Sequence, residues 1–259
     1  ATNDQSVSML HRFMRPRQIA VIGGDVAAEV IRQCQTIGFS GEIWPVNPRR
    51  TELAGLPCYP SIEALPSAPD ASFIAVSREQ TIDLVRALND RGAGGVVCYA
   101  SGFAEIGGDG IQLQNELIEA SGNMALVGPN CYGLLNYLDR CALWPDRHGG
   151  QAVSRGVAVI TQSGNIGLNI TMQQRNLPLA YMIAVGNCAG TAYHDYIDAL
   201  LDDERITAIG LHIEGLSDIT AFSHVALRAL KKRIPIIALK TGSTSASATV
   251  TASHTSSLS

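Results

Sequence analysis

The chain has 259 residues, of which 46% are hydrophobic, 16% charged and 5% aromatic. This length and apolar content predict one large or two medium folded domains and exclude a disordered chain. Nineteen basic and 23 acidic residues give a formal net charge of -4, which disfavours nucleic acid as a partner.

The first 130 residues alternate between short apolar strands and amphipathic helices. Residues 19–24 (IAVIGG) are predicted to form a strand that ends in two glycines. Apolar residues spaced three and four apart then predict a helix, with Asp25 as its N-cap and Gly38 as its C-cap. Because the strands are apolar on both faces, we expect a parallel sheet covered on both sides. The later strands are predicted at 42–46, 71–76, 94–100 and 124–128, and the later helices at 80–90 and 110–121.

A second α/β unit is predicted after a Gly-, Pro- and Asn-rich loop at 128–155. The two units are expected to join near Gly149-Gly150, each as a doubly wound sheet. A Ser/Thr-rich tail at 241–259 follows the last strand without a closing helix, which indicates either a disordered end or a truncated domain. The strands of this unit are predicted at 156–161, 179–185, 206–213 and 234–240, and its helices near 165–175, 192–202 and 218–232.

The sequence shows neither a membrane span nor a secretion signal. The longest apolar runs, such as residues 19–22 and 234–239, are far shorter than the ~20 residues needed to cross a bilayer. The N-terminal 17 residues contain no apolar segment typical of a signal peptide. Six cysteines without a CxxC pair are expected to be reduced thiols rather than a disulfide framework or a zinc site. We therefore expect a cytoplasmic protein with no membrane partner and no metal site.

The junction after the first strand has the features of a phosphate site. Backbone N–H groups and the positive end of a helix dipole converge after Gly23 and Gly24. The spacing differs from the G-x-G-x-x-G of NAD enzymes, and the second strand ends in Asn47 instead of an acid for the ribose hydroxyls. Arg49 and Arg50 suit a nucleotide with an extra ribose phosphate, either NADP or coenzyme A, but solvated surface charges are an equal alternative.

Eight short motifs follow one another in an order that resembles a known family. Together they are similar to the NDP-forming acyl-CoA synthetases, which include the α part of succinyl-CoA synthetase and the ADP-forming acetate–CoA ligases. The resemblance implies a Rossmann-like CoA-binding domain at residues 9–150 and a flavodoxin-like succinyl-CoA-ligase-type domain at 151–259, truncated at its C-terminus. The motifs are IAVIGG (19–24), GEIWPVNPRR (41–50), SGFAE (101–105), GPNCYGLLN (128–136), TQSGNIG (161–167), GN (186–187), IEG (213–215) and SHTSSL (253–258).

By this resemblance, the first domain binds coenzyme A. The glycine pair after the first strand would hold the pyrophosphate, and the NPR segment the adenosine end. The SGF and GPNC segments would line the pantetheine path, with a cysteine close to the CoA thiol. The implied residues are Gly23, Gly24, Asn47, Pro48, Arg49, Ser101, Gly102, Asn130 and Cys131.

The resemblance also implies a phosphorylated histidine in the second domain. A histidine in a Ser/Thr tail is usually only exposed, but His254 in SHTSSL matches the family's SHTGSLAG histidine, which is transiently phosphorylated. A neutral imidazole can attack with one nitrogen while an acceptor holds the other, and Glu214 in IEG would be that acceptor. His212 lies two residues earlier on the same strand face, and we interpret it as a packed core histidine in preference to a pocket residue.

The phosphate and the substrate need donors as well. A predicted strand ends and a predicted helix begins within residues 161–165, so backbone amides and a hydroxyl can face an anion there. The residues concerned are Thr161, Ser163, Gly164 and Asn165. This segment is not the G-x-S-x-G of a nucleophile elbow, so anion binding is the better role for its serine. Asn187, in the GN pair, would position the substrate.

The resemblance implies the reversible reaction of a carboxylate, CoA and ATP to acyl-CoA, ADP and phosphate. The sequence shows no ATP-binding motif, so ATP and Mg²⁺ are expected on an ATP-grasp β-type subunit or on a C-terminal domain that follows residue 259. Without that part we expect the chain to be inactive, and we expect the protein to be an oligomer. A ligase for a larger aromatic or dicarboxylic acid, a non-catalytic CoA-sensing module and an NAD(P) oxidoreductase are the alternatives.

Overall fold

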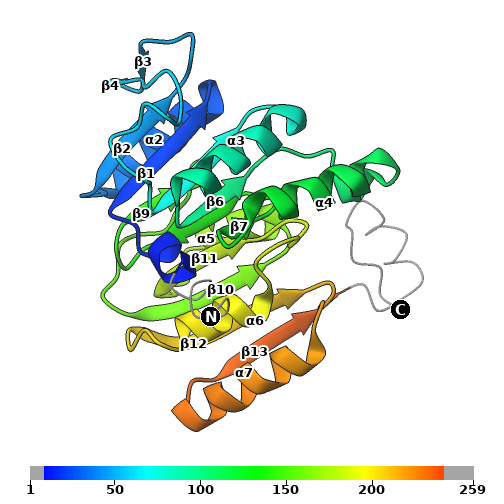
Figure 1. Cartoon of the computed structure of the whole chain (residues 1–259). Coiled ribbons are helices and arrows are strands. Elements are labelled where there is room, and N and C mark those ends of the chain that lie inside the picture. Colours follow the sequence, from blue (N-terminus) through cyan, green and yellow to red (C-terminus); the bar gives the residue numbers. More distant parts are fainter. Residues whose placement is uncertain (1–8, 242–259) are drawn as a thin grey trace.

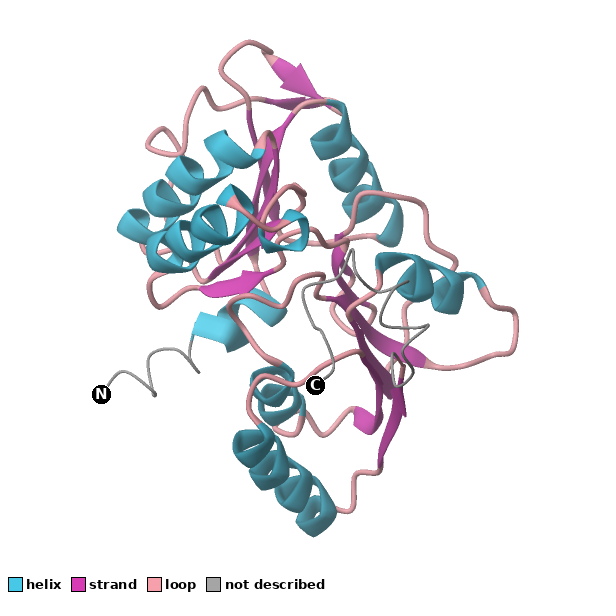
Figure 2. Ribbon diagram, turned by 90° about the vertical axis from the view of Figure 1, so that its right-hand side faces the viewer, coloured by secondary structure: helices cyan, strands magenta, loops and turns pink. Residues whose placement is uncertain are grey.

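The first sheet is parallel, as predicted. The computed structural model describes residues 9–241. Five parallel strands lie in the order β2-β1-β5-β6-β7 (Figure 1). Helices cover both of its faces (Figure 2). The elements are β1 (Gln18–Gly23), α2 (Asp25–Ile37), β2 (Glu42–Val46), β5 (Ala71–Ala75), α3 (Arg78–Arg91), β6 (Gly95–Cys98), α4 (Asp109–Ser121) and β7 (Ala125–Val127).

The second sheet is mixed and begins earlier than the sequence suggests. Its order is β13-β12-β10-β11-β8-β9, with β8 (Gly133–Asn136) and β9 (Cys141–Leu143) antiparallel to their neighbours. The prediction of a loop throughout 128–155 is therefore wrong, because this hairpin extends the second sheet. The division at residue 150 into folding units remains a prediction. The other elements are β10 (Gly156–Thr161), α5 (Gly164–Met172), β11 (Leu179–Ala184), α6 (Tyr193–Leu200), β12 (Ile206–Ile213), α7 (Ile219–Lys232) and β13 (Ile236–Lys240).

The ends of the helices follow their capping residues, with one correction. Helix α2 begins at Asp25, which is its first helical residue; its N-cap is Gly24, so the prediction of Asp25 as the cap is wrong. Gly38 ends the helix with φ 82°, a left-handed conformation that glycine adopts without strain. Two short strands, β3 (Glu52–Leu53) and β4 (Leu56–Pro57), and a 3-10 turn, η1 (Ala104–Ile106), were not predicted.

Helix α2 joins the two units into one core. Its apolar face packs on β1 and β5 and also meets the β8–β9 hairpin of the other sheet, where Cys34 Sγ donates to the carbonyl of Ala142 at 3.1 Å. The opposite face of the first sheet has a separate core under α3 and α4. Because the larger core contains residues of both sheets, their burial stabilises the relative position of the two units.

The loop after β7 and the loop after β11 are hydrogen-bonded to each other at the carboxyl ends of the two sheets. The amides of Asn187 and Ala189 donate to the carbonyls of Pro129 and Gly128, each at 3.0 Å. Gly186 has no room for a side chain, since a Cβ there would lie 2.2 Å from the carbonyl oxygen of Asn130. The loop after β7 and the loop after β11 thus lie in contact.

The strand orders locate the ligand sites. In each sheet the direction in which successive strands are added reverses at one point. This switch point lies between β1 and β5 in the first sheet and between β10 and β12 in the second sheet. In open α/β sheets, ligands bind at the carboxyl ends of the strands at such switch points. None of the helices within residues 9–241 is long and apolar enough to cross a membrane.

Candidate functional site

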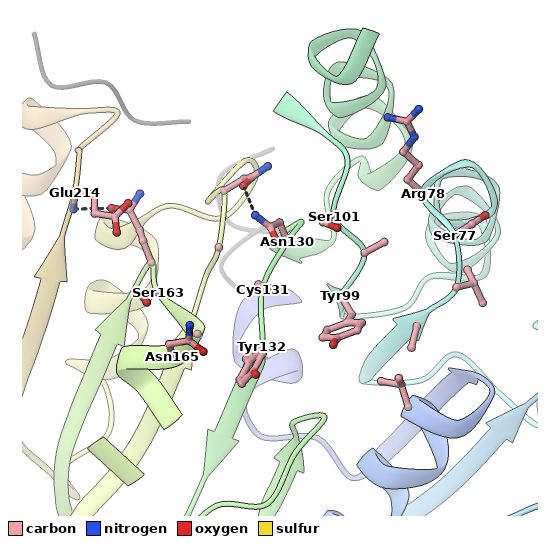
Figure 3. A pocket seen from close by; sticks show the side chains of 18 residues that line it. Ser77, Arg78, Tyr99, Ser101, Asn130, Cys131, Tyr132, Ser163, Asn165 and Glu214 are labelled. Atoms are coloured by element: carbon pink, nitrogen blue, oxygen red, sulfur yellow. Dashed lines mark hydrogen bonds between the residues drawn. The ribbon is translucent and has the colours of Figure 1, made fainter. Parts of the chain in front are cut away.

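A central cavity of about 590 Å³ lies between the carboxyl ends of the two sheets. Figure 3 shows residues of the second unit on one side of it and residues of the first unit on the other, with the 130–132 segment between them. The lining residues are Val26, Ala75, Val76, Ser77, Arg78, Tyr99, Ala100, Ser101, Asn130, Cys131, Tyr132, Gln162, Ser163, Gly164, Asn165, Gly186, Asn187 and Glu214.

A second cavity, of about 640 Å³, lies at the carboxyl ends of β1 and β2. Val76 lines both cavities. The structure therefore divides eight of the nine predicted cofactor residues between two adjacent cavities, and Gly102 lines neither of them. The second cavity contains Gly23, Gly24, Asn47, Pro48 and Arg49, whereas Ser101, Asn130 and Cys131 line the central one.

Asn47 shapes the wall of the second cavity. Its Nδ2 donates to the Gly23 carbonyl at 2.8 Å, and its Oδ1 accepts from the amides of Arg49 and Arg50 at 2.8 and 2.9 Å. The side chain of Arg50 pairs with Asp25 at 2.8 Å, while Arg49 is exposed at the cavity rim. Of the two arginines, Arg49 is the one that lines the second cavity.

The Ser101–Gly102 segment is held by two charged side chains. Arg78 Nη1 donates to the Gly102 carbonyl at 2.6 Å, and Glu105 Oε1 accepts from the Gly102 amide at 2.5 Å. Gly102 itself does not line the cavity, but Arg78 does. The sequence analysis missed Arg78. The signal for it is Ser77, the N-cap of α3, which lies two residues after the end of β5, a strand that reaches the cavity.

Cys131 is a buried wall residue. Its Sγ donates to the Cys98 carbonyl at 3.3 Å, and burial raises the pKa of the thiol well above its usual value. The thiol therefore stays protonated at neutral pH, which argues against a nucleophilic role. The six cysteines are unpaired in the structure.

The Thr161–Asn165 segment forms the start of helix α5. Ser163 is the N-cap, and its hydroxyl accepts from the Ile166 amide at 3.3 Å. The amides of Gly164 and Asn165, in the first turn, have no partner within the helix and can bind an anion. Thr161 is fully buried behind this segment, where its hydroxyl accepts from the Ser163 amide at 3.1 Å. Thr161 thus supports the loop, whereas Ser163, Gly164 and Asn165 line the cavity.

Glu214 and Gln162 meet at the neighbouring strand end. Glu214 is only 4% exposed and lines the cavity. Its amide donates to Gln162 Oε1 at 2.7 Å. His212 is buried, and its Nδ1 and Nε2 contact the hydroxyls of Thr161 and Thr241 at 3.0 and 3.1 Å. These contacts support the interpretation of His212 as a core residue.

Asn187 links the two units at the cavity. Its Nδ2 donates to Glu105 Oε2 at 2.5 Å and to Gln114 Oε1 at 3.0 Å, and its Oδ1 lies 3.4 Å from Asn130 Nδ2. The prediction that Asn187 positions the substrate stays a prediction. His254 lies outside the described residues. Among residues 9–241, no group of three or more metal-ligating side chains could hold a metal ion.

Comparison with known proteins agrees with this arrangement. The family model for a CoA binding domain matches residues 17–137, and the model for a succinyl-CoA ligase like flavodoxin domain matches 154–259. The chain belongs to the NDP-forming acyl-CoA synthetase superfamily. It combines that family's two successive domains, CoA-binding and succinyl-CoA-ligase-like, as predicted.

Similar proteins share the arrangement over almost the whole chain. The chain is 36% identical to trans-feruloyl-CoA synthase FCS1 of an unknown prokaryotic organism, over 96% of this chain and 37% of that protein. It is 33% identical to the α subunit of ADP-forming acetate–CoA ligase II of Pyrococcus furiosus, over 96% and 56%. The dinucleotide forming acetyl-coenzyme A synthetase 1 of Ca. Korarchaeum cryptofilum, solved with phosphate and ADP, superposes with a TM-score of 0.86 at 30% identity, over 96% and 55%. The chain thus spans between a third and just over half of the length of these relatives.

Proposed function

We propose that this chain is the CoA-binding and phosphohistidine part of an NDP-forming acyl-CoA synthetase. The reaction is carboxylate, CoA and ATP to acyl-CoA, ADP and phosphate, through a phosphohistidine and an acyl phosphate. One observation carries the proposal: the start of α5 and the Glu214 carboxylate share a cavity with the CoA-binding unit. Hydrogen-bond donors for an anion, a carboxylate and the proposed path of CoA thus lie in the same central cavity.

The two cavities together hold CoA in this proposal. The second cavity holds the adenosine end of CoA between Asn47, Pro48 and Arg49, and Gly23 and Gly24 face its pyrophosphate. Ser101 and Asn130 guide the pantetheine chain past Val76, the residue common to both cavities. Val76 therefore marks the point at which CoA passes from one cavity to the other.

The second unit carries out the phosphoryl transfer in this proposal. His254 accepts the phosphoryl group and passes it to the carboxylate, while Glu214 accepts a hydrogen bond from the other imidazole nitrogen. The first turn of α5 and the Ser163 hydroxyl bind the phosphoryl oxygens. ATP and Mg²⁺ are bound by an ATP-grasp subunit or domain, without which the chain is inactive, and the assembled protein works as an oligomer in the cytoplasm.

A labelling experiment tests the proposal. The protein containing its ATP-grasp part is incubated with γ-labelled ATP and Mg²⁺, beside His254→Ala and Glu214→Gln. We expect acid-labile, alkali-stable label on the wild type, none on His254→Ala, and reduced label on Glu214→Gln. Equal label on all three would exclude His254 as the phosphorylated residue, and absence of label from all three would favour a non-catalytic CoA-sensing module.

An aromatic acid is the second candidate substrate. The rings of Tyr99 and Tyr132 both line the central cavity, and Tyr132 packs edge-to-face on Trp144 with centroids 5.1 Å apart. Such walls suit a planar ring. A screen of carboxylates by CoA-thioester formation distinguishes the two: a preference for acetate over ferulate by the complete protein would refute the aromatic alternative.

A further inference from the structure

Gln162 is a buried polar residue that the predicted roles leave out. It lies between the end of β10 and the start of α5, immediately before Ser163. It is 7% exposed, yet it lines the central cavity. A buried amide without hydrogen-bond partners is costly, so each end of this side chain requires an explanation.

The oxygen end is fully explained by the strand next to it. Oε1 accepts from the Glu214 amide at 2.7 Å and from the Gly215 amide at 3.2 Å. Only the oxygen of a glutamine side chain can accept from two N–H groups, so chemistry determines which end faces the strand. Nε2 must then be at the other end of the amide.

The nitrogen end has no acceptor among the described residues. The hydrogen bonds of the Gln162 side chain all involve Oε1. Nε2 therefore presents two N–H donors to the cavity that the residue lines, beside the first turn of α5. Three kinds of donor converge there: two backbone amides, the Ser163 hydroxyl and a side-chain amide.

We propose that Gln162 is a phosphoryl-binding residue, whose Nε2 donates to an oxygen of the phosphate or acyl phosphate while its Oε1 holds the Glu214–Gly215 strand end. This inference rests on the proposed function. The side chain thereby connects the anion to the backbone of Glu214. A carboxylate at this position would repel the anion, whereas an amide adds a donor without adding charge.

A pair of substitutions separates the two ends of the side chain. Gln162→Glu has the same shape and retains an oxygen for the two strand amides, but it replaces the donor with a negative oxygen. Gln162→Met removes both ends. At pH 8, where a glutamate is ionised, binding of inorganic phosphate and acetyl phosphate to the 259-residue chain is measured by calorimetry, with CoA binding and thermal unfolding as controls.

We expect Gln162→Glu to unfold within about 2–3 °C of the wild type, to bind CoA within twofold and to bind phosphate at least tenfold more weakly. Gln162→Met should lose both stability and phosphate affinity. Unchanged phosphate binding by Gln162→Glu, or wild-type binding of CoA without phosphate, would overturn the proposal for this residue. A wild-type chain that binds neither ligand would instead refute the proposed function itself.

Discussion

Gly23 offers the sharpest test of how the first sheet is built. Its φ is +141°, and an added Cβ would lie 2.5 Å from the carbonyl oxygen of Ala75 on the neighbouring strand β5. Gly24, the next residue, differs in both respects: its φ is -107°, and a Cβ there would meet only Arg50 Nη2, at 3.7 Å. The pair allows a matched comparison of Gly23→Ala and Gly24→Ala.

The expected effect of Gly23→Ala follows from the φ of Gly23 and from the short distance between the added Cβ and Ala75. An unfavourable φ costs a non-glycine residue about 1–3 kcal/mol. Overpacking against a backbone atom costs a further ~1–3 kcal/mol. We therefore expect the free energy of unfolding to fall by about 2–6 kcal/mol and the melting temperature by roughly 5–20 °C. Gly24→Ala should change the free energy of unfolding by less than ~1 kcal/mol, the ordinary range at an N-cap.

Thermal and urea unfolding of the two variants measure this difference directly. If Gly23→Ala unfolds within 2 °C of Gly24→Ala, the close approach of β1 and β5 is wrong. CoA binding by the folded variants then shows whether Gly24 is needed for the ligand. A glycine required by the sheet and one required by the cofactor are thus distinguished.

Three further predictions concern the link between the units, a thiol and a histidine. Asn187→Ala loses the hydrogen bonds to Glu105 and Gln114, so it should lower the free energy of unfolding, measured in urea, by about 1–3 kcal/mol. Asn115→Ala, on the exposed side of α4, should change it little. Equal effects of the two substitutions would contradict the role of Asn187 in joining the two units. Cys131 is buried, and burial raises the pKa of its thiol well above the usual value. Iodoacetamide at pH 8 should therefore alkylate the half-buried Cys58 well before Cys131, as followed by mass spectrometry of the peptides. Equal rates of alkylation on the native protein would refute this. Burial lowers the pKa of His148, so the unfolded state binds the proton more readily, and stability should fall as the pH drops through about 6.5 towards the lower folded pKa. His148→Gln should weaken this loss between pH 7.5 and 5.5, and an unchanged pH dependence would contradict it.

The alternation of strands and helices was predictable because it depends on local patterns. Apolar runs and 3.6-residue spacing are properties of neighbouring residues, so the strands at 156–161 and 206–213 were predicted with the bounds that the structure has. The short β8–β9 hairpin was not, because its pairing partner, β11, follows it by some forty residues. Its four- and three-residue strands contain too few residues for a pattern to be recognised.

The same distinction applies to the candidate site. The sequence by itself determined the residue types: the glycines at the end of β1, the NPR segment, the serine-capped start of α5 and the glutamate that follows β12. Only the tertiary structure decided which of them share a cavity, that Thr161 lies behind the loop, and that Arg78 and Gln162 belong to the wall. These outcomes depend on which strand ends meet and on which hydrogen bonds a buried amide must satisfy. Such contacts join residues up to more than a hundred positions apart, and no local pattern encodes them.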